Sequence, residues 1–253
     1  MMFLVNHPVV TFVVTLIVLW FSSQIGVLLR RRRADLNESE RADIGVILAA
    51  ILTLLGLIIG FTFSMASTRY DQRKNLEEGE ANAIGTEYLR ADLLPASDAQ
   101  HIRELLRAYL DQRILFYSSH GDELQQVNAT TSKLQAELWD TVKASAAADR
   151  NSVEALALSG MNDVLNSQGY TQAAWWNRIP LAAWGLMWVI AIGCNVMVGY
   201  YVLPTDHKGI RFILPLLTAV AFLLIADIDS PRRGIIRVHP QNLITLADSL
   251  RPH

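Results

Sequence analysis

One stretch of the sequence, residues 44–94, constrains the fold more than any other. Its first part, residues 44–66, carries no charged side chain and exceeds the roughly 20 apolar residues that cross a bilayer as a helix. The chain then becomes densely charged, yet no proline or cluster of turn residues interrupts it before Pro95. The sequence therefore predicts one long helix that crosses a membrane and continues for several turns into water.

The distribution of charge along the chain is typical of a membrane protein. The mean hydropathy is +0.24 and 51% of the residues are hydrophobic, while the charged residues gather in a few blocks. Long apolar runs cover residues 9–29, 44–66, 179–203 and 212–228. We therefore expect an all-α polytopic membrane protein, with its first two transmembrane helices within residues 1–66 and the last two within residues 179–228.

The segment between the second and third apolar runs, residues 67–178, has the pattern of a helical extramembrane domain. Apolar residues recur at helical spacing over residues 102–114, 124–142 and 153–165. A serine at position 97 followed by Gln100 resembles a capping box that would begin the first of these helices. The remaining residues, 229–253, form a charged tail that we expect at the membrane surface.

Several classes of function find no support in the sequence. No phosphate-binding loop, nucleophile–histidine pair or metal-binding spacing of His and Cys occurs, which predicts neither an enzyme nor a cofactor or metal site. Glu77 and Glu80 share a helix face, where a cation is conceivable, but a solvated or subunit-contacting helix accounts for them better. The single cysteine, Cys194, excludes an intramolecular disulfide. No basic tract interleaved with aromatic residues indicates nucleic acid as a partner.

The second apolar run carries two overlapping patterns. Gly56 and Gly60 have the G-x-x-x-G spacing that lets a neighbouring helix approach closely. Thr53, Leu57 and Phe61 follow at intervals of four residues and so lie on one helix face. Such a face is either a contact between helices or the apolar constriction of a pore, because hydrophobic constrictions gate by excluding water.

The arginine cluster at residues 30–33 follows the first apolar run. It reads most simply as a topology anchor at the lipid headgroups, and alternatively as a site for anionic lipid. The Lys and Arg residues near the membrane ends divide evenly between the two sides, so they do not predict the orientation.

Two segments are similar to a known family. Residues 60–95 (GFTFSMASTRYDQRKNLEEGEANAIGTEYLRADLLP) and 227–238 (DIDSPRRGIIRV) resemble the two signature blocks of the bacterial bestrophin-like domain family. This resemblance implies a small four-span protein of the inner membrane with a helical insert between spans two and three.

A more distant similarity links residues 57–77 to the second span of the bestrophins, which are pentameric anion channels in animals and include cation-conducting bacterial relatives. It implies a pore lined by the second span, with the neck at Thr53, Leu57 and Phe61. Only Phe61 keeps the bulky aromatic side chain of the bestrophin neck, and the acidic Ca²⁺-binding run after the last span is absent from this sequence.

These patterns leave two functional hypotheses. The first is a homo-oligomeric, pentameric channel for inorganic ions, with chloride-like anions favoured by positive potential at the pore mouth. The residues that would supply this potential are Arg69, Arg73, Arg232 and Arg233. The second is a non-conducting membrane scaffold or sensor whose acidic helical domain binds a partner.

Overall fold

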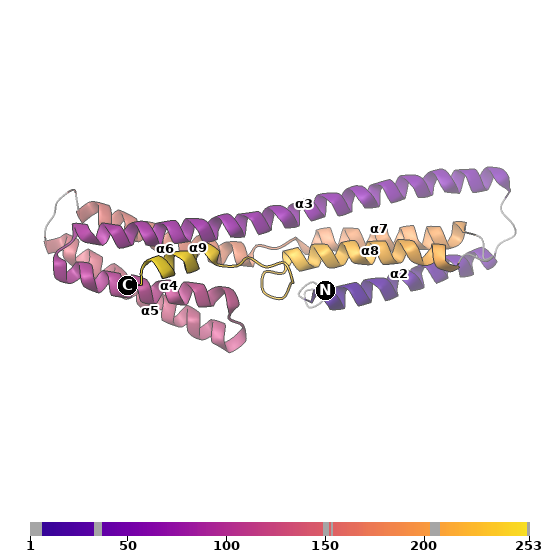
Figure 1. Ribbon diagram of the computed structural model, residues 1–253. Helices are drawn as coiled ribbons and strands as arrows, with labels where there is room; N and C mark the ends of the chain where they lie inside the picture. Colours follow the sequence, from indigo (N-terminus) through magenta and orange to yellow (C-terminus); the bar gives the residue numbers. More distant parts are fainter. Residues whose placement is uncertain (1–6, 33–36, 149–151, 153, 203–207, 252–253) are drawn as a thin grey trace. The chain divides into compact units, whose positions relative to one another are not determined.

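The computed structural model describes residues 7–32, 37–148, 152, 154–202 and 208–251, and the described residues contain helices but no strand (Figure 1). The elements in chain order are α2 (Pro8–Arg31), α3 (Glu38–Arg90), the 3-10 turn η1 (Ala91–Leu93), α4 (Ala96–Ser118), α5 (Gly121–Ala148), α6 (Glu154–Trp176), α7 (Leu181–Tyr201), α8 (Lys208–Asp229) and α9 (Gln241–Ser249). The prediction of an all-α protein is confirmed at this level.

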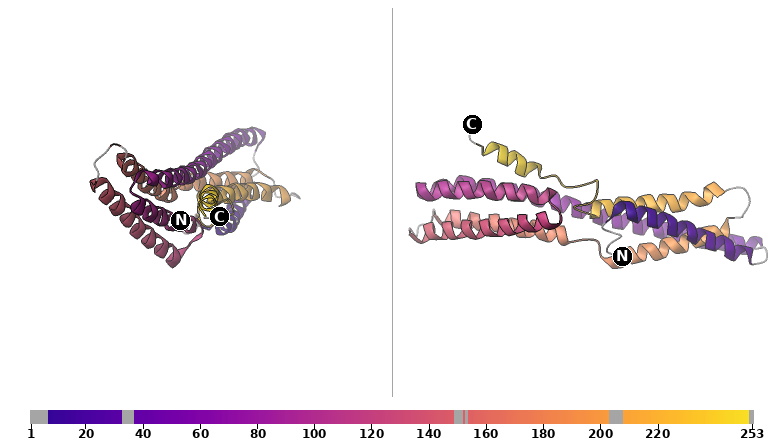
Figure 2. Two further views of the ribbon diagram at one scale, coloured as in Figure 1. Left: turned by 60° about the vertical axis from the view of Figure 1, so that its left-hand side comes forward. Right: turned by 90° about the horizontal axis from the view of Figure 1, so that it is seen from below.

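The long helix predicted from residue 44 onward is present as α3, an unbroken helix of 53 residues (Figures 1 and 2). It starts before the apolar run, at Glu38, and it ends at Arg90, where η1 leads to Pro95. A proline has no backbone N–H and clashes with the preceding helical turn, so the helix stops here as expected.

The predicted apolar runs coincide with helices: runs 9–29, 44–66 and 212–228 lie within α2, α3 and α8, and residues 181–201 of the third run form α7. Four helical stretches, which include α2, α3, α7 and α8, are long and apolar enough to cross a membrane. In the fourth apolar run, 50% of the most apolar window is buried inside the protein, against 11% for α3. The last apolar helix therefore lies among its neighbours in unit 1.

The chain divides into two compact units that differ from the predicted segments at their edges. Unit 1 comprises Met1–Tyr70 and Arg178–Arg237, and unit 2 comprises Asp71–Asn177 and Val238–His253. The predicted tail 229–253 is therefore not one segment: residues up to Arg237 belong to unit 1, while the later residues belong to unit 2. The sequence analysis missed α9 because its apolar periodicity extends over only nine residues.

Unit 1 is a helical bundle built around Trp184 of α7. Trp184 and Trp188 both meet Phe222 of α8 edge-on, with ring centroids 5.9 and 5.7 Å apart. Leu19 of α2 and Leu55 of α3 belong to the same buried cluster. The four apolar helices thus share one core within this unit.

Unit 2 packs the second part of α3 with α4, α5, α6 and α9. Its interior contains a group of three aromatic rings, in which Phe116 and Tyr117 of α4 each meet Trp175 of α6 edge-on. The predicted capping box at the start of α4 is wrong. Pro95 is the N-cap residue, and the Ser97 hydroxyl faces Asp98 instead of a backbone N–H of the first turn.

Candidate functional site

One side of α3 in unit 1 is exposed along its length, and we call it the open face of α3. It consists of exposed residues, Val46, Ala49, Ala50, Thr53, Gly56, Leu57, Gly60, Phe61, Ser64 and Thr68. The exposed bulky residues Ile47, Leu54, Phe63 and Met65 lie at its edges. The exposed fraction is 64% for Phe61 and 52% for Leu57. The three positions that the sequence assigned to a constriction therefore lie together on a surface that the described residues of unit 1 leave uncovered.

The opposite side of α3 holds the helix in the bundle. Leu55, Thr62 and Ala66 are buried there, and Ile51 and Ile58 pack against the same core. Because successive residues turn by about 100° around a helix, these positions point away from the open face. The core thus fixes which side of α3 is turned outward.

The open face is less polar than its sequence suggests. The Thr53 hydroxyl donates a hydrogen bond to the backbone oxygen of Ala49 at 2.9 Å, and that of Thr68 donates to Ser64 at 2.9 Å. The hydroxyl hydrogen of each threonine is therefore bonded within its own helix, and the methyl group remains on the surface. Thr53 can serve in an apolar constriction despite its hydroxyl.

Gly56 and Gly60 do not pack against another helix of this chain. A Cβ added at either position would find no neighbouring heavy atom within 4 Å. Within the described part of the subunit, the predicted helix contact at this motif is therefore not made, and the assignment of these glycines to helix packing stays a prediction.

The arginines assigned to a pore mouth have separate surroundings. In unit 1, Arg233 is exposed and hydrogen-bonds to the ring of His7, while Arg69 and Arg232 are half-buried. In unit 2, the Arg73 side chain is buried and donates to the backbone oxygens of Ala174 at 3.3 Å and Asn177 at 3.4 Å. Arg73 binds the C-terminal end of α6, where carbonyl groups lack helical partners, so its assignment to a pore mouth is wrong.

Glu77, Glu80 and Glu87 of α3 in unit 2 are buried and do not form a solvated face, contrary to the expectation for Glu77 and Glu80. Glu77 is buried and accepts hydrogen bonds from the backbone N–H groups of Asn242 at 2.9 Å and Leu243 at 3.0 Å, and from the Asn242 side chain at 2.6 Å. The carboxylate of α3 thus caps the N-terminus of α9, which has no capping side chain of its own.

Glu80 forms a second buried arrangement in unit 2. Its carboxylate accepts hydrogen bonds from Arg113 of α4 at 2.5 Å and from the Thr171 hydroxyl of α6 at 3.1 Å. Both members of the ion pair are fully buried. Glu77 and Glu80 are thus engaged by protein donors, and among the described residues no group of three or more His, Cys, Asp or Glu side chains could hold a metal ion.

Glu87 is the third buried carboxyl of this series and differs from the other two. Within the described chain, neither of its oxygens has a hydrogen-bond partner. Burial raises its pKa from an ordinary value of 4.5 to about 8, with Asp163 raising it further and Arg90 opposing the shift. Its carboxylate lies against Gly160 of α6, where a Cβ would overlap it.

A signal for this buried face is present in the sequence. The apolar residues Ala81, Ile84 and Ala91 recur on the same side of the helix as Glu77, Glu80 and Glu87. Counting only apolar residues hides the pattern, because charged residues occupy half of its positions.

The segment after α8 folds around Asp227. The Asp227 carboxylate accepts hydrogen bonds from the backbone N–H groups of Ile235 at 2.7 Å and Ile236 at 2.8 Å. Gly234 lies so close to the backbone oxygen of Asp227 that a Cβ would overlap it. Asp229 accepts a further hydrogen bond from the Ile179 N–H at 3.1 Å. The DIDSPRRGII sequence therefore forms a closed turn that fixes the end of α8.

The fold matches solved structures over almost its whole length. A crystal structure of a bacterial bestrophin homologue from Klebsiella pneumoniae, solved as a point variant, has a TM-score of 0.66 and 14% identity, with 94% of this chain and 97% of that chain covered. A second crystal structure of a bestrophin homologue from Klebsiella pneumoniae gives a TM-score of 0.65 and 14% identity, with 94% and 96% covered. At this identity the likeness concerns the fold.

Sequence comparison supplies the family. No curated protein sequence matches the chain. The Bestrophin-like domain model matches residues 10–243, which include the apolar helices, the helical insert and the turn around Asp227. The chain therefore belongs to the bestrophin-like domain family of membrane proteins.

Proposed function

We propose that this protein is an ion channel of the cell membrane that works as a homo-oligomer, with the pore lined by the open face of α3. Four helices would cross the inner membrane, and copies of α3 would surround a central axis. Thr53, Leu57 and Phe61 would form the narrow part. Family membership and the fold support this function, since channels are known among the bestrophins.

The observation that carries the proposal is the contrast between α3 and the other three apolar helices. The exposed side chains of α2, α7 and α8 are mostly bulky, as expected against lipid; examples are Val13, Ile17, Phe21, Leu186, Val189, Leu217 and Val220. The open face of α3 is mostly Ala, Gly, Ser and Thr, while bulky side chains such as Val46, Leu54 and Phe63 are exposed elsewhere on it or at its edges. Small and hydroxyl-bearing residues are typical of surfaces that meet protein or water inside a membrane.

An oligomer explains why so little of α3 is covered within one subunit. Only 11% of its apolar window is buried, against 33% for α2. Gly56 and Gly60 would then allow close approach of the neighbouring copies. In a ring of five subunits, as in the bestrophins, the small residues would contact the neighbouring copies and the rest of the open face would surround a water-filled axis.

The preference for anions rests on the arginines of unit 1. Arg69 follows the open face on α3, and Arg232 and Arg233 follow α8. Repeated in each subunit, their charges would create a positive potential that concentrates chloride-like anions. Arg73 is left out, because it is buried against α6.

The experiment is ion efflux from liposomes that contain the purified protein. We expect halide efflux to exceed K⁺ efflux, and Phe61→Ala to raise the flux because it widens an apolar constriction. Phe21→Ala is the matched control, since Phe21 is 56% exposed on α2 and would face lipid.

A second candidate function, a non-conducting scaffold or sensor, is favoured by one observation. The helical unit contains buried charges that order α9, as a regulated docking module would. Folded and inserted protein that releases neither halide nor K⁺ would support this function and contradict the channel.

A further inference from the structure

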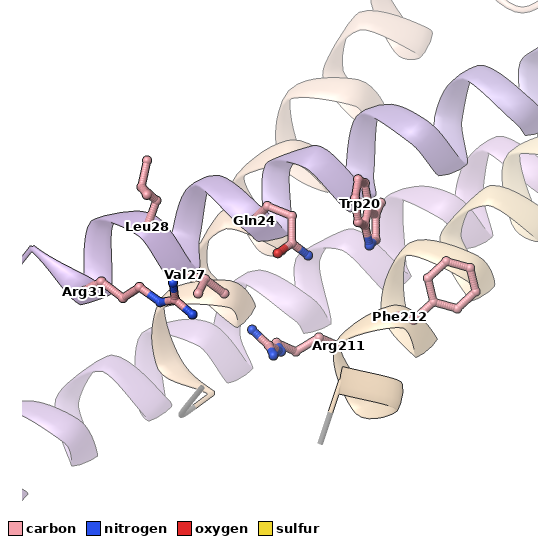
Figure 3. A pocket seen from close by; sticks show the side chains of 7 residues that line it. All are labelled: Trp20, Gln24, Val27, Leu28, Arg31, Arg211 and Phe212. Carbon is pink, nitrogen blue, oxygen red and sulfur yellow. The ribbon is translucent and has the colours of Figure 1, made fainter. Parts of the chain in front are cut away.

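A cavity of about 450 Å³ opens between α2 and α8 in unit 1 (Figure 3). It is lined by Trp20, Gln24, Val27, Leu28, Arg31, Arg211 and Phe212. None of these residues belongs to the open face of α3 or to the turn around Asp227. The cavity is therefore a separate feature of the apolar bundle.

Two guanidinium groups and one amide meet at this cavity. The Arg31 side chain comes from the last residue of α2 and the Arg211 side chain from the first turn of α8, and both are directed toward the space beside Gln24 (Figure 3). No carboxylate is among the lining residues. Within the described parts of the chain, no hydrogen bond or ion pair engages either guanidinium.

The burial of Arg211 makes this arrangement unusual. Its exposed fraction is only 8%, and the residue lines the cavity. A buried cation without a counter-charge is costly, and an arginine in such a position normally binds a carboxylate or phosphate through two hydrogen bonds. The cavity therefore presents the hydrogen-bond donors that an anionic group needs.

The remaining walls are apolar, which restricts the kind of anion. Trp20 lies 11 residues before Arg31, about 16 Å along the helix axis, and the exposed Phe212 lies on the same side of the cavity (Figure 3). The cavity thus has a cationic part at the end of two membrane-spanning helices and an aromatic part farther into the apolar region. A molecule that matches both parts has an anionic head and a hydrocarbon chain.

We propose that this cavity binds an anionic phospholipid, with its phosphodiester held by Arg31, Arg211 and Gln24 and its acyl chain along Trp20 and Phe212. Basic pockets between transmembrane helices are typical sites for such headgroups, and arginine presents a fork of donors that fits two phosphate oxygens. Inorganic phosphate shares the headgroup chemistry but has nothing to place against the aromatic wall.

The test is native mass spectrometry of the purified full chain, titrated with phosphatidylglycerol, phosphatidylcholine or inorganic phosphate. We expect phosphatidylglycerol to bind about tenfold more tightly than phosphatidylcholine, because both lipids offer the phosphodiester but only phosphatidylcholine adds an ammonium group, which cancels the net negative charge that the two guanidinium groups attract. Arg211→Gln and Arg31→Gln should each remove most of this preference. Arg32→Gln is the matched control, because Arg32 is the next residue, is exposed, and does not line the cavity.

Three results would overturn the proposal. Equal affinity for the two lipids would exclude selection of the anionic headgroup. An equal loss with Arg32→Gln would assign the binding to the general charge of this end of α2. Competition by inorganic phosphate at the concentration at which the lipid binds would assign the cavity to a free anion. If Arg211→Gln does not fold, Arg31→Gln and Gln24→Leu decide the question, because both residues are exposed on α2.

Discussion

Gly26 of α2 and Gly199 of α7 lie against each other's helix backbone. A Cβ added at Gly26 would lie 2.9 Å from the carbonyl carbon of Gly199 and would overlap the backbone oxygen of Val196. A Cβ added at Gly199 would overlap the backbone oxygen of Ser23. The two helices therefore cross at a distance that only glycine permits, and this crossing fixes α2 in the bundle of unit 1.

Gly199→Ala should destabilise the protein, because the added methyl group has to push two backbones apart. We expect a cost of about 1–3 kcal/mol and a fall in Tm of several degrees. Thermal unfolding in detergent measures it. Gly193→Ala is the control on the same helix, where no atom lies within 4 Å of the added Cβ, and an equal fall for both variants would contradict the close crossing.

The two pairs of glycines show which helix contacts can be predicted from the sequence. The G-x-x-x-G spacing of Gly56 and Gly60 predicts a helix contact without identifying its partner, and among the described residues no atom lies within 4 Å of a Cβ added at either glycine. Gly26 and Gly199 are far apart in the sequence, so no local spacing connects them. The four apolar helices were predictable because their length and lack of charge are local properties.

Glu77→Gln should release α9. The substitution removes the charge that accepts two backbone N–H groups and the Asn242 amide at the start of this helix. Hydrogen bonds to a charged group contribute about 1.5–3 kcal/mol each, more than a helix of nine residues gains from its own turns. Amide hydrogen exchange within Gln241–Ser249 should become faster.

Glu78→Gln is the control for this experiment, because Glu78 is the next residue and is exposed. Unchanged exchange in α9 with Glu77→Gln would contradict the capping role. Apolar periodicity could not reveal this contact, since it joins a carboxylate of α3 to backbone groups more than 160 residues later.

Replacing only one member of the buried ion pair Glu80–Arg113 should lower the stability more than replacing both members. Arg113→Met leaves a fully buried carboxylate with the Thr171 hydroxyl as its remaining donor, and we expect a loss of about 3–5 kcal/mol. The double variant Glu80→Leu with Arg113→Met removes both charges and should recover much of the loss. Tm values of the two single variants and the double variant test this expectation; strictly additive losses would contradict it.

Glu87 should make the stability of the protein depend on pH. Because its pKa is raised from 4.5 to about 8 by burial, the folded state holds a proton that the unfolded state releases at lower pH. Its contribution to stability is thus fully present below pH 4.5 and is lost as the pH rises through about 8. Glu87→Gln mimics the protonated form and should remove this loss.

The measurement is Tm against pH from 5 to 9 for the wild type and Glu87→Gln. The wild type should lose stability relative to the variant as the pH rises, and the difference should level off above about 8. A constant difference over this range would show that the Glu87 carboxyl is ionised throughout. Glu78→Gln again serves as the exposed control.

The central claim, that the open face of α3 lines an aqueous pore, is tested most directly by cysteine accessibility. Cys194 is the only cysteine and is buried, so Cys194→Ala gives a suitable background. Ser64→Cys changes one atom on the open face, and Val220→Cys places a thiol on the exposed side of α8 as the lipid-facing control.

Both variants are reconstituted in liposomes and treated with a charged, membrane-impermeant methanethiosulfonate reagent during halide efflux. We expect the reagent to block efflux through Ser64→Cys and to leave Val220→Cys unchanged. Efflux that persists after modification of Ser64→Cys, or a Ser64→Cys thiol that does not react in a conducting protein, would contradict a pore along α3.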